Sequence, residues 1–190
     1  KSATLCAHAG AITAVLGRNG CGKSTLMQMA VGMRAPDFGA VHFNGEVHLR
    51  PRLHEMARAG LYFMPDRPAL PRGFTVGEVF ANVEWRFRNG RTHEAIEHFD
   101  LGVLMDQSTR QLSGGEQRRV ELAIAWARQP VCLLADEPFN ELSPLATEEI
   151  MAMMRGLARL GCAIIVSGHE VATLMSLADE SAGTLAAYGA

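Results

Sequence analysis

A segment near the N-terminal end carries the most specific chemical signal in the sequence. It reads GRNGCGKST and fits the pattern G-x-x-x-x-G-K-[ST] at Gly17, Gly22, Lys23 and Ser24. The glycines let successive backbone N–H groups face one point, and a following helix adds its positive N-terminal end, so the segment is suited to bind phosphate. We expect Lys23 to reach the terminal phosphates and Ser24 to bind Mg²⁺. The predicted phosphate-binding residues are Gly17, Arg18, Asn19, Gly20, Cys21, Gly22, Lys23, Ser24 and Thr25.

The lysine of this segment is unusual for the chain as a whole. Of 18 basic residues only Lys1 and Lys23 are lysines. A compact ammonium fits a cradle of backbone groups better than a planar guanidinium does. The alternative, a glycine-rich turn between a strand and a helix without a ligand, stays open at this point.

Two adjacent carboxylates follow a short apolar run later in the chain. Asp136 and Glu137 come directly after residues 131–135, VCLLA. Ionised groups at the end of a buried strand need a partner, and a metal ion would supply one. We therefore predict that Asp136 binds Mg²⁺ and that Glu137 polarises a water molecule for attack on a phosphate. A solvated pair that caps the next element is the alternative.

A third candidate segment, LSGGEQRR, precedes an amphipathic helical stretch. Ser113 is a favourable N-cap, and Gly114 and Gly115 expose backbone donors at the start of the helix. Such a start can bind an anion. Taken alone, the pattern is equally consistent with a simple helix cap.

The elements that hold these segments alternate between short apolar runs and longer helical stretches. This alternation predicts an α/β fold with a mainly parallel sheet flanked by helices. The dipeptide Asn44-Gly45 predicts a hairpin that forms an antiparallel edge, whereas the tail 178–190 has no pattern typical of a helix or strand. The predicted strands are 11–16, 61–64, 131–135 and 163–167, and the predicted helices are 23–33, 146–160 and 170–177.

Residues 66–112 interrupt this alternation. Their apolar residues repeat at intervals of three and four, which predicts a small helical insertion. The expected organisation is a single domain over 1–190, with a catalytic core formed by 1–65 and 113–190 and a helical subdomain at about 66–112.

The composition disfavours several other classes of protein. Hydrophobic residues make up 48% and charged residues 20%, which is typical of a packed domain, and a net charge of −2 without a basic run disfavours nucleic-acid binding. The apolar runs 131–135 and 162–166 are shorter than the roughly 18 residues that cross a bilayer. Four cysteines without a CxxC pair suggest reduced thiols and a cytosolic compartment.

Together these segments resemble the ATP-binding cassette family, over about residues 10–177. Residues 17–25 resemble its phosphate loop, 112–116 its signature, and 131–137 its magnesium strand with the catalytic glutamate. His169 in AIIVSGHE is similar to the family's switch histidine. The resemblance implies a P-loop NTPase fold, ATP and Mg²⁺ as cofactors, and a contact of His169 with the γ-phosphate.

The same resemblance implies partners and a location. Two ATPase subunits, identical or different, would enclose two ATP molecules, with Ser113, Gly114 and Gly115 acting on the nucleotide of the other subunit. The helical insertion would offer a groove, lined by 75–83, to transmembrane permease subunits. The chain would then lie in the cytoplasm, on the cytoplasmic face of the membrane. No nucleic-acid partner is implied.

Two positions depart from the family's pattern. The family usually has a glutamine after the strand equivalent to 61–64, where it contacts Mg²⁺, and this chain has Asp66. An acid there can also contact the metal, but it adds negative charge near the phosphates. Ser143 stands where an aspartate usually precedes Pro144, so the usual carboxylate of the dimer interface is missing. Hydrolysis or its coupling is therefore expected to be altered.

These features predict an ATPase that hydrolyses Mg-ATP and drives a transmembrane partner. Two alternatives stay open. One is a nucleotide-gated regulatory module with little turnover, because of Asp66 and Ser143. The other is a cassette protein outside transport, acting in translation or DNA repair. Such relatives usually join two cassettes or insert coiled coils, for which 190 residues leave no room.

Overall fold

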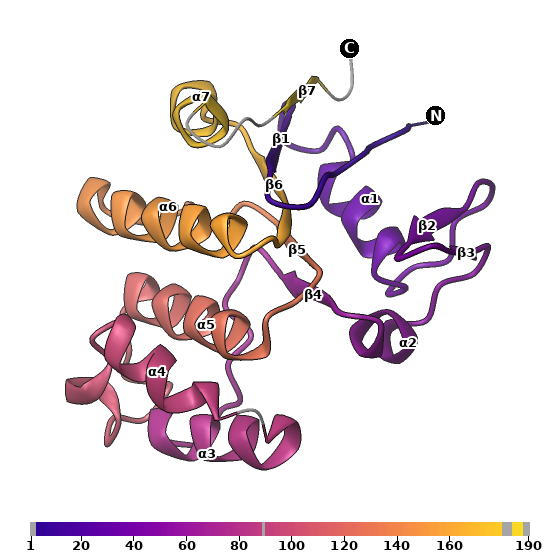
Figure 1. The fold of residues 1–190 in the computed structure, drawn as a ribbon. Helices are drawn as coiled ribbons and strands as arrows, with labels where there is room; N and C mark the ends of the chain where they lie inside the picture. Colours follow the sequence, from indigo (N-terminus) through magenta and orange to yellow (C-terminus); the bar gives the residue numbers. More distant parts are fainter. Residues whose placement is uncertain (1–2, 89, 180–183, 188–190) are drawn as a thin grey trace.

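A five-stranded parallel sheet forms the centre of the molecule (Figure 1). The computed structural model describes residues 3–88, 90–179 and 184–187. The strand order is β4-β5-β6-β1-β7, and in the register Ile12 lies opposite Ile164 and Leu61 opposite Cys132. The strands are β1 (Ile12–Leu16), β4 (Leu61–Met64), β5 (Cys132–Ala135), β6 (Ala163–Gly168) and β7 (Thr184–Ala187).

Helices cover both faces of this sheet, which explains why its strands are apolar runs without alternation. On one face lie α1 (Lys23–Ala30) and α2 (Leu53–Arg58), and on the other lie α5 (Gly114–Arg128), α6 (Pro144–Arg159) and α7 (Val171–Asp179) (Figure 1). Successive strand residues point to opposite sides. Leu133 therefore packs in the larger core beneath α5 and α6, and Leu134 in the smaller core with Met27 of α1 and Met56 of α2.

The predicted helical insertion is present. It contains α3 (Val76–Phe87), α4 (Arg91–His98) and a short 3₁₀ turn at Gly102–Leu104, and α3 begins with a capping box between Thr75 and Glu78. Apolar residues of the insertion, among them Phe80 and Leu101, belong to the same hydrophobic core as α5. The division into a core and a separate subdomain at 66–112 stays a prediction.

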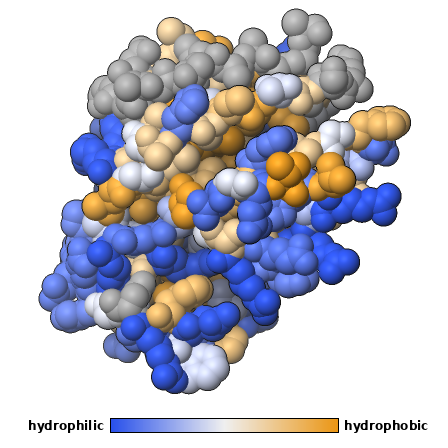
Figure 2. All heavy atoms as spheres, turned by 45° about the vertical axis from the view of Figure 1, so that its right-hand side comes forward, coloured by the Kyte–Doolittle hydropathy of each residue, from blue (hydrophilic) through white to orange (hydrophobic). Residues whose placement is uncertain are grey.

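Two expectations about the edges of the sheet need correction. The hairpin is present, as β2 (Val41–Phe43) and β3 (Glu46–His48), but it forms a two-stranded sheet of its own and not an edge of the main sheet. Exposed Phe38, Val47 and Leu49 flank or belong to it, and Figure 2 shows apolar side chains gathered on the upper half of the adjoining face.

The second correction concerns the tail, for which no strand was expected. Within it β7 pairs in parallel with β1 and extends the sheet by one strand, with Thr13 opposite Thr184. Its sequence, TLAA, contains one large apolar residue and two alanines, unlike the run LYFM of the equally short edge strand β4, so it gives no clear strand pattern. The pairing with β1 is what makes these residues a strand.

Candidate nucleotide-binding site

The predicted phosphate loop connects β1 to α1 at the carboxyl end of the sheet. Gly22 is the N-cap of α1 with φ at 110°, a conformation that L side chains rarely adopt. Among the described residues no side chain caps this helix start, so its first N–H groups lack the side-chain acceptor that a capped helix has. Uncapped N–H groups and the helix dipole favour an anion at this position.

Lys23 is folded back into this loop. Its ammonium donates to the carbonyl oxygen of Gly17 at 2.7 Å and to that of Arg18 at 3.4 Å, and its side chain is only 4% exposed. It also forms an ion pair with Glu137, with Nζ 3.1 Å from Oε1. The buried ammonium therefore lies between the phosphate loop and the acidic residues that follow β5.

The acidic pair is held by a hydroxyl from the neighbouring strand. Ser167 of β6 is fully buried, and its Oγ donates to Oδ1 of Asp136 at 2.6 Å. The same oxygen accepts from the backbone N–H of Glu137 at 3.1 Å. Glu137 has φ at 46°, in the left-handed region, which is uncommon for a residue with a side chain. The turn at Glu137 thus leaves the line of the strand immediately after Asp136.

Glu137 is bound at both of its carboxylate oxygens. Oε1 contacts Lys23, and Oε2 lies 3.0 Å from Nδ1 of His169, which follows β6. The Glu137 side chain is 11% exposed and the His169 side chain is 44% exposed. The His169 imidazole on one side and the Lys23 ammonium on the other fix the orientation of the Glu137 carboxylate.

A cavity of about 300 Å³ brings eight of the sixteen predicted site residues together, whereas Gly17, Arg18, Cys21 and His169 are not among the described residues that line it. Asp66 lies in its wall with Lys23 and Ser24, and Asn140 also lines it. Asp136 is buried and is not among the described residues of this lining. The full lining consists of Asn19, Gly20, Gly22, Lys23, Ser24, Thr25, Asp66, Glu137 and Asn140.

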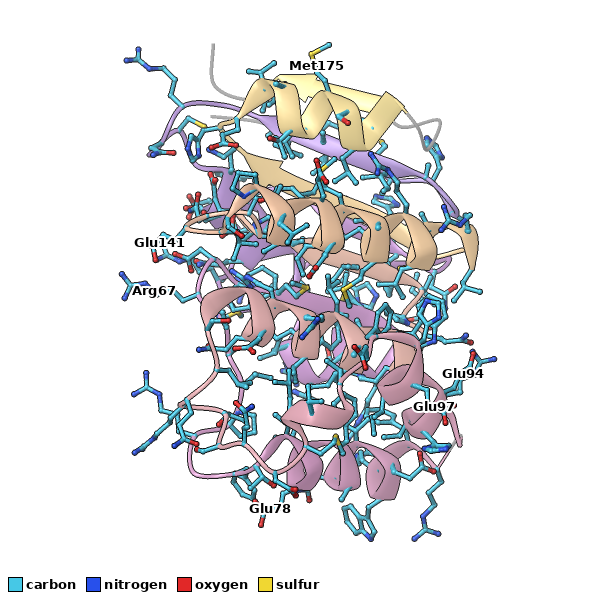
Figure 3. The ribbon with its side chains drawn as sticks, turned by 90° about the vertical axis from the view of Figure 1, so that its left-hand side faces the viewer. Arg67, Glu78, Glu94, Glu97, Glu141 and Met175 are labelled. Atoms are coloured by element: carbon cyan, nitrogen blue, oxygen red, sulfur yellow. The ribbon has the colours of Figure 1, made fainter. Side chains whose placement is uncertain are left out.

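These residues meet because they follow the carboxyl ends of parallel strands, where ligands of open α/β sheets bind. Arg67 after β4 and Glu141 after β5 show this arrangement, since both project from the same edge of the molecule in Figure 3. Glu94 and Glu97 of α4 lie at the opposite edge of the same view. The loops that carry Asp66 and Glu137 are therefore neighbours in space.

The predicted signature residues lie at the start of α5 and not in the described wall of the phosphate cavity. Ser113 and Glu116 form a reciprocal capping box at the start of α5, and the two hydrogen bonds from Ser113 lower the pKa of Glu116. The Cβ of Ala146 in α6 lies 3.2 Å from the position a Cβ would take on Gly115. Ser113, Gly114 and Gly115 are not among the described residues that line the phosphate cavity.

Comparison with known proteins agrees with this geometry. Residues 1–140 match the family model described as ABC transporter. The chain belongs to the ABC transporter family. It is similar to the lipopolysaccharide export system ATP-binding protein LptB of Haemophilus influenzae, with 32% identity over 98% of this chain and 82% of LptB. LptB of Acidithiobacillus ferridurans is 32% identical over 90% of this chain and 74% of that protein.

Solved structures agree with the fold of this ABC family member. The ATP-binding subunit of an ABC transporter matches 97% of this chain and 77% of that one with a TM-score of 0.80 at 23% identity. The cbiO1 protein from Clostridium perfringens, described as part of the ABC transporter complex cbiONQ, has a TM-score of 0.76 at 25% identity over 95% of this chain and 74% of that one. The predicted P-loop NTPase fold is confirmed, and the chain is an ATP-binding subunit with ATPase activity.

Sequence reasoning missed two residues of the site in this ABC ATPase. Ser167 binds both acidic residues, and Asn140 lines the phosphate cavity. For Ser167 a signal existed, because it is a polar residue at the end of an otherwise apolar strand, as Asp136 is. Asn140 lies in a loop without a recognisable pattern.

Ser143 has a structural role that its sequence position alone did not reveal. Its Oγ accepts from the backbone N–H of Ala146 at 3.3 Å, so it is the N-cap of α6, and Pro144 follows at the first helical position. Serine and aspartate cap helices about equally well. The departure from the family's aspartate therefore preserves the helix start and removes only the charge.

Proposed function

We propose that this ABC ATPase binds the triphosphate of ATP in the cavity around Lys23 and hydrolyses it with Glu137 as the general base. The observation that supports this most strongly is the buried contact between Lys23 and Glu137, 3.1 Å apart, beside an uncapped helix start. A phosphate oxygen that binds Lys23 replaces Glu137 as its partner. The freed carboxylate can then accept a proton from water as the water oxygen attacks the γ-phosphorus and ADP leaves.

The donors around this cavity fit a magnesium ion. Mg²⁺ prefers oxygen ligands, and Ser24 in the cavity wall supplies a hydroxyl, while the buried Asp136 directly before Glu137 supplies a carboxylate. We assign the metal to Ser24 and Asp136, with Asp66 as a further ligand or a ligand through water. When bound, the ion neutralises charge on the phosphate oxygens. Ser167 then orients Asp136 through the hydrogen bond at 2.6 Å.

His169 is assigned to the γ-phosphate. This assignment is supported by its Nδ1, which lies 3.0 Å from Oε2 of Glu137, a residue in the wall of the phosphate cavity. We propose that the imidazole holds the Glu137 carboxylate in place and also contacts the γ-phosphate.

A second ATPase subunit completes the site. Ser113, Gly114 and Gly115 are a capped helix start outside the described lining of the phosphate cavity, which is consistent with action on the nucleotide of the other subunit. The partner is an identical or a different ATPase subunit. ATP bound between the two subunits would favour the closed dimer, and hydrolysis would allow it to open.

A transmembrane partner is assigned to an apolar groove of about 800 Å³ between β4, α2 and α3. Val79 and Val83 of the predicted lining segment 75–83 contribute to it, together with Phe63, Leu70, Phe74 and Phe87. None of the helices in the part of the chain that the structure describes has the length and apolar character of a membrane span. We propose that the chain lies on the cytoplasmic face of the membrane, bound to permease subunits through this groove.

Single-turnover hydrolysis by the wild type and by Glu137→Gln tests the proposal. The variant is expected to bind ATP and form dimers but to lose hydrolysis by a factor of about 10² or more, because the general base is absent. Equal rates in the two proteins would contradict the assigned role of Glu137. A wild type that binds ATP and dimerises without measurable turnover would support the regulatory module instead.

A further inference from the structure

A buried ion pair on α5 holds the loop that follows β4. Arg118 and Glu121 are 2% and 3% exposed, and Nη1 of Arg118 lies 2.9 Å from Oε2 of Glu121. Their spacing of three residues places both side chains on the same face of the helix. On that face they contact the loop after β4 and are shielded from solvent.

Each member of the pair also binds one backbone group of the loop. Nη2 of Arg118 donates to the carbonyl oxygen of Asp66. Oε1 of Glu121 accepts from the backbone N–H of Ala69 at 2.6 Å. Two contacts three residues apart fix both the position of the loop and its direction.

The two bound residues belong to different sites. Asp66 lines the phosphate cavity with Lys23. Ala69 lines the apolar groove, as does Glu121 itself. The helix that carries the pair begins with the signature segment at Ser113. A single pair of side chains thus connects the phosphate cavity, the groove and the signature helix.

Stability alone gives a weak reason for this arrangement. Burial raises the pKa of Glu121, and the nearby charge of Arg118 opposes the shift. Removing two charges from water offsets most of what their attraction gains, so apolar residues of similar volume often stabilise a fold as well. An apolar pair cannot orient the loop by hydrogen bonds. The guanidinium of Arg118 can, because its donors lie in a fixed plane.

We propose that Arg118 and Glu121 form a positioning device that fixes Asp66 at the phosphate cavity and makes its loop move together with α5. The inference rests on the proposed ATPase function. Neither residue is among the described residues that line the phosphate cavity, so both act through Asp66. A shift of the signature helix therefore changes the distance of the Asp66 carboxylate from the phosphates.

A double-mutant cycle on kcat tests the device. Arg118→Met with Glu121→Leu replaces the pair by apolar residues, and Asp66→Ala removes the carboxylate it positions. We expect each change to lower kcat by about tenfold or more while KM for ATP changes by less than about threefold. The protein that carries all three substitutions is expected to have a kcat no more than about twofold below that of the slower of the two parent variants, the Arg118 and Glu121 variant and Asp66→Ala. Losses that multiply would overturn the inference, because a role in stability alone acts independently of Asp66.

The chain offers a matched control for charge removal. Arg52, the N-cap of α2, and Glu55 of that helix form an ion pair of the same residue types and spacing, at 3.6 Å, with side chains 72% and 45% exposed. Arg52→Met with Glu55→Leu is expected to leave kcat and KM as in the wild type. Hydrogen exchange at the Ala69 amide gives a direct readout. Its protection should fall in the Arg118 and Glu121 variant and persist in the control.

A conservative variant covers the case in which the apolar pair fails to fold. Arg118→Lys keeps the charge, but one ammonium lacks the planar fork that reaches both Glu121 and the Asp66 carbonyl, so kcat should fall by an intermediate factor. Wild-type kcat in this variant, with Ala69 still protected, would overturn the inference. A wild type without ATPase activity would refute the proposed function, whereas the loss of Ala69 protection is measured independently of turnover.

Discussion

Replacement of Ser167 by alanine removes a buried hydroxyl that connects the ends of β5 and β6. The change breaks a bond of 2.6 Å to the Asp136 carboxylate and leaves the Glu137 N–H without its acceptor at 3.1 Å. Loss of the charge-assisted hydrogen bond to Asp136 and loss of the acceptor of the partly buried Glu137 N–H together lower the free energy of unfolding by about 3 kcal/mol. For a chain of this length the melting temperature should fall by roughly 6–12 °C.

Urea denaturation of Ser167→Ala beside the wild type measures this loss. Ser176→Ala is the matched control, since Ser176 is exposed on α7 and it is its backbone oxygen that accepts a hydrogen bond from Arg155, which the substitution leaves in place. Its free energy of unfolding should stay within about 0.5 kcal/mol of the wild type. An equally small change in Ser167→Ala would refute the reasoning, because the hydroxyl would then hold neither Asp136 nor the turn at Glu137.

Two further predictions concern cysteine reactivity and the start of α6. Burial raises the pKa of Cys132 and Cys162 to about 12, so at pH 8 iodoacetamide should modify exposed Cys6 and half-buried Cys21 alone, as peptide mass spectrometry would show. ATP should protect Cys21 and not Cys6, and modified Cys21 that leaves binding intact would contradict the placement of the phosphate loop. Ser143→Ala should lower the free energy of unfolding by about 1 kcal/mol through loss of the cap, whereas Ser143→Asp should preserve it. A loss of the same size in Ser143→Asp, measured by urea denaturation, would contradict the capping role.

The parts of the fold that depend on local pattern could be predicted from the sequence. The four predicted strands, β1, β4, β5 and β6, appear within one residue of the predicted ends, because residues such as Leu133 and Ile164 belong to runs that are apolar on both faces. The phosphate loop is also local, since its glycines, Lys23 and Ser24 are consecutive or nearly so.

Contacts between distant segments could not be predicted in this way. The role of Ser167 depends on β6 lying beside β5, and no residue pattern states the order of strands in a sheet. Arg118 and Glu121 have the spacing of an ordinary surface pair on a helix, and only the loop packed over them makes them buried. The strand β7 likewise depends on the edge that β1 provides.

Calorimetric titration with a non-hydrolysable analogue of ATP and Mg²⁺ tests the central claim most directly. The account predicts saturable heat for the wild type and none for Lys23→Met, with both proteins folded by circular dichroism. The variant loses the ammonium that lies between the phosphate loop and Glu137. Equal heats for the two folded proteins, or no heat for either, would contradict the binding of a triphosphate at Lys23.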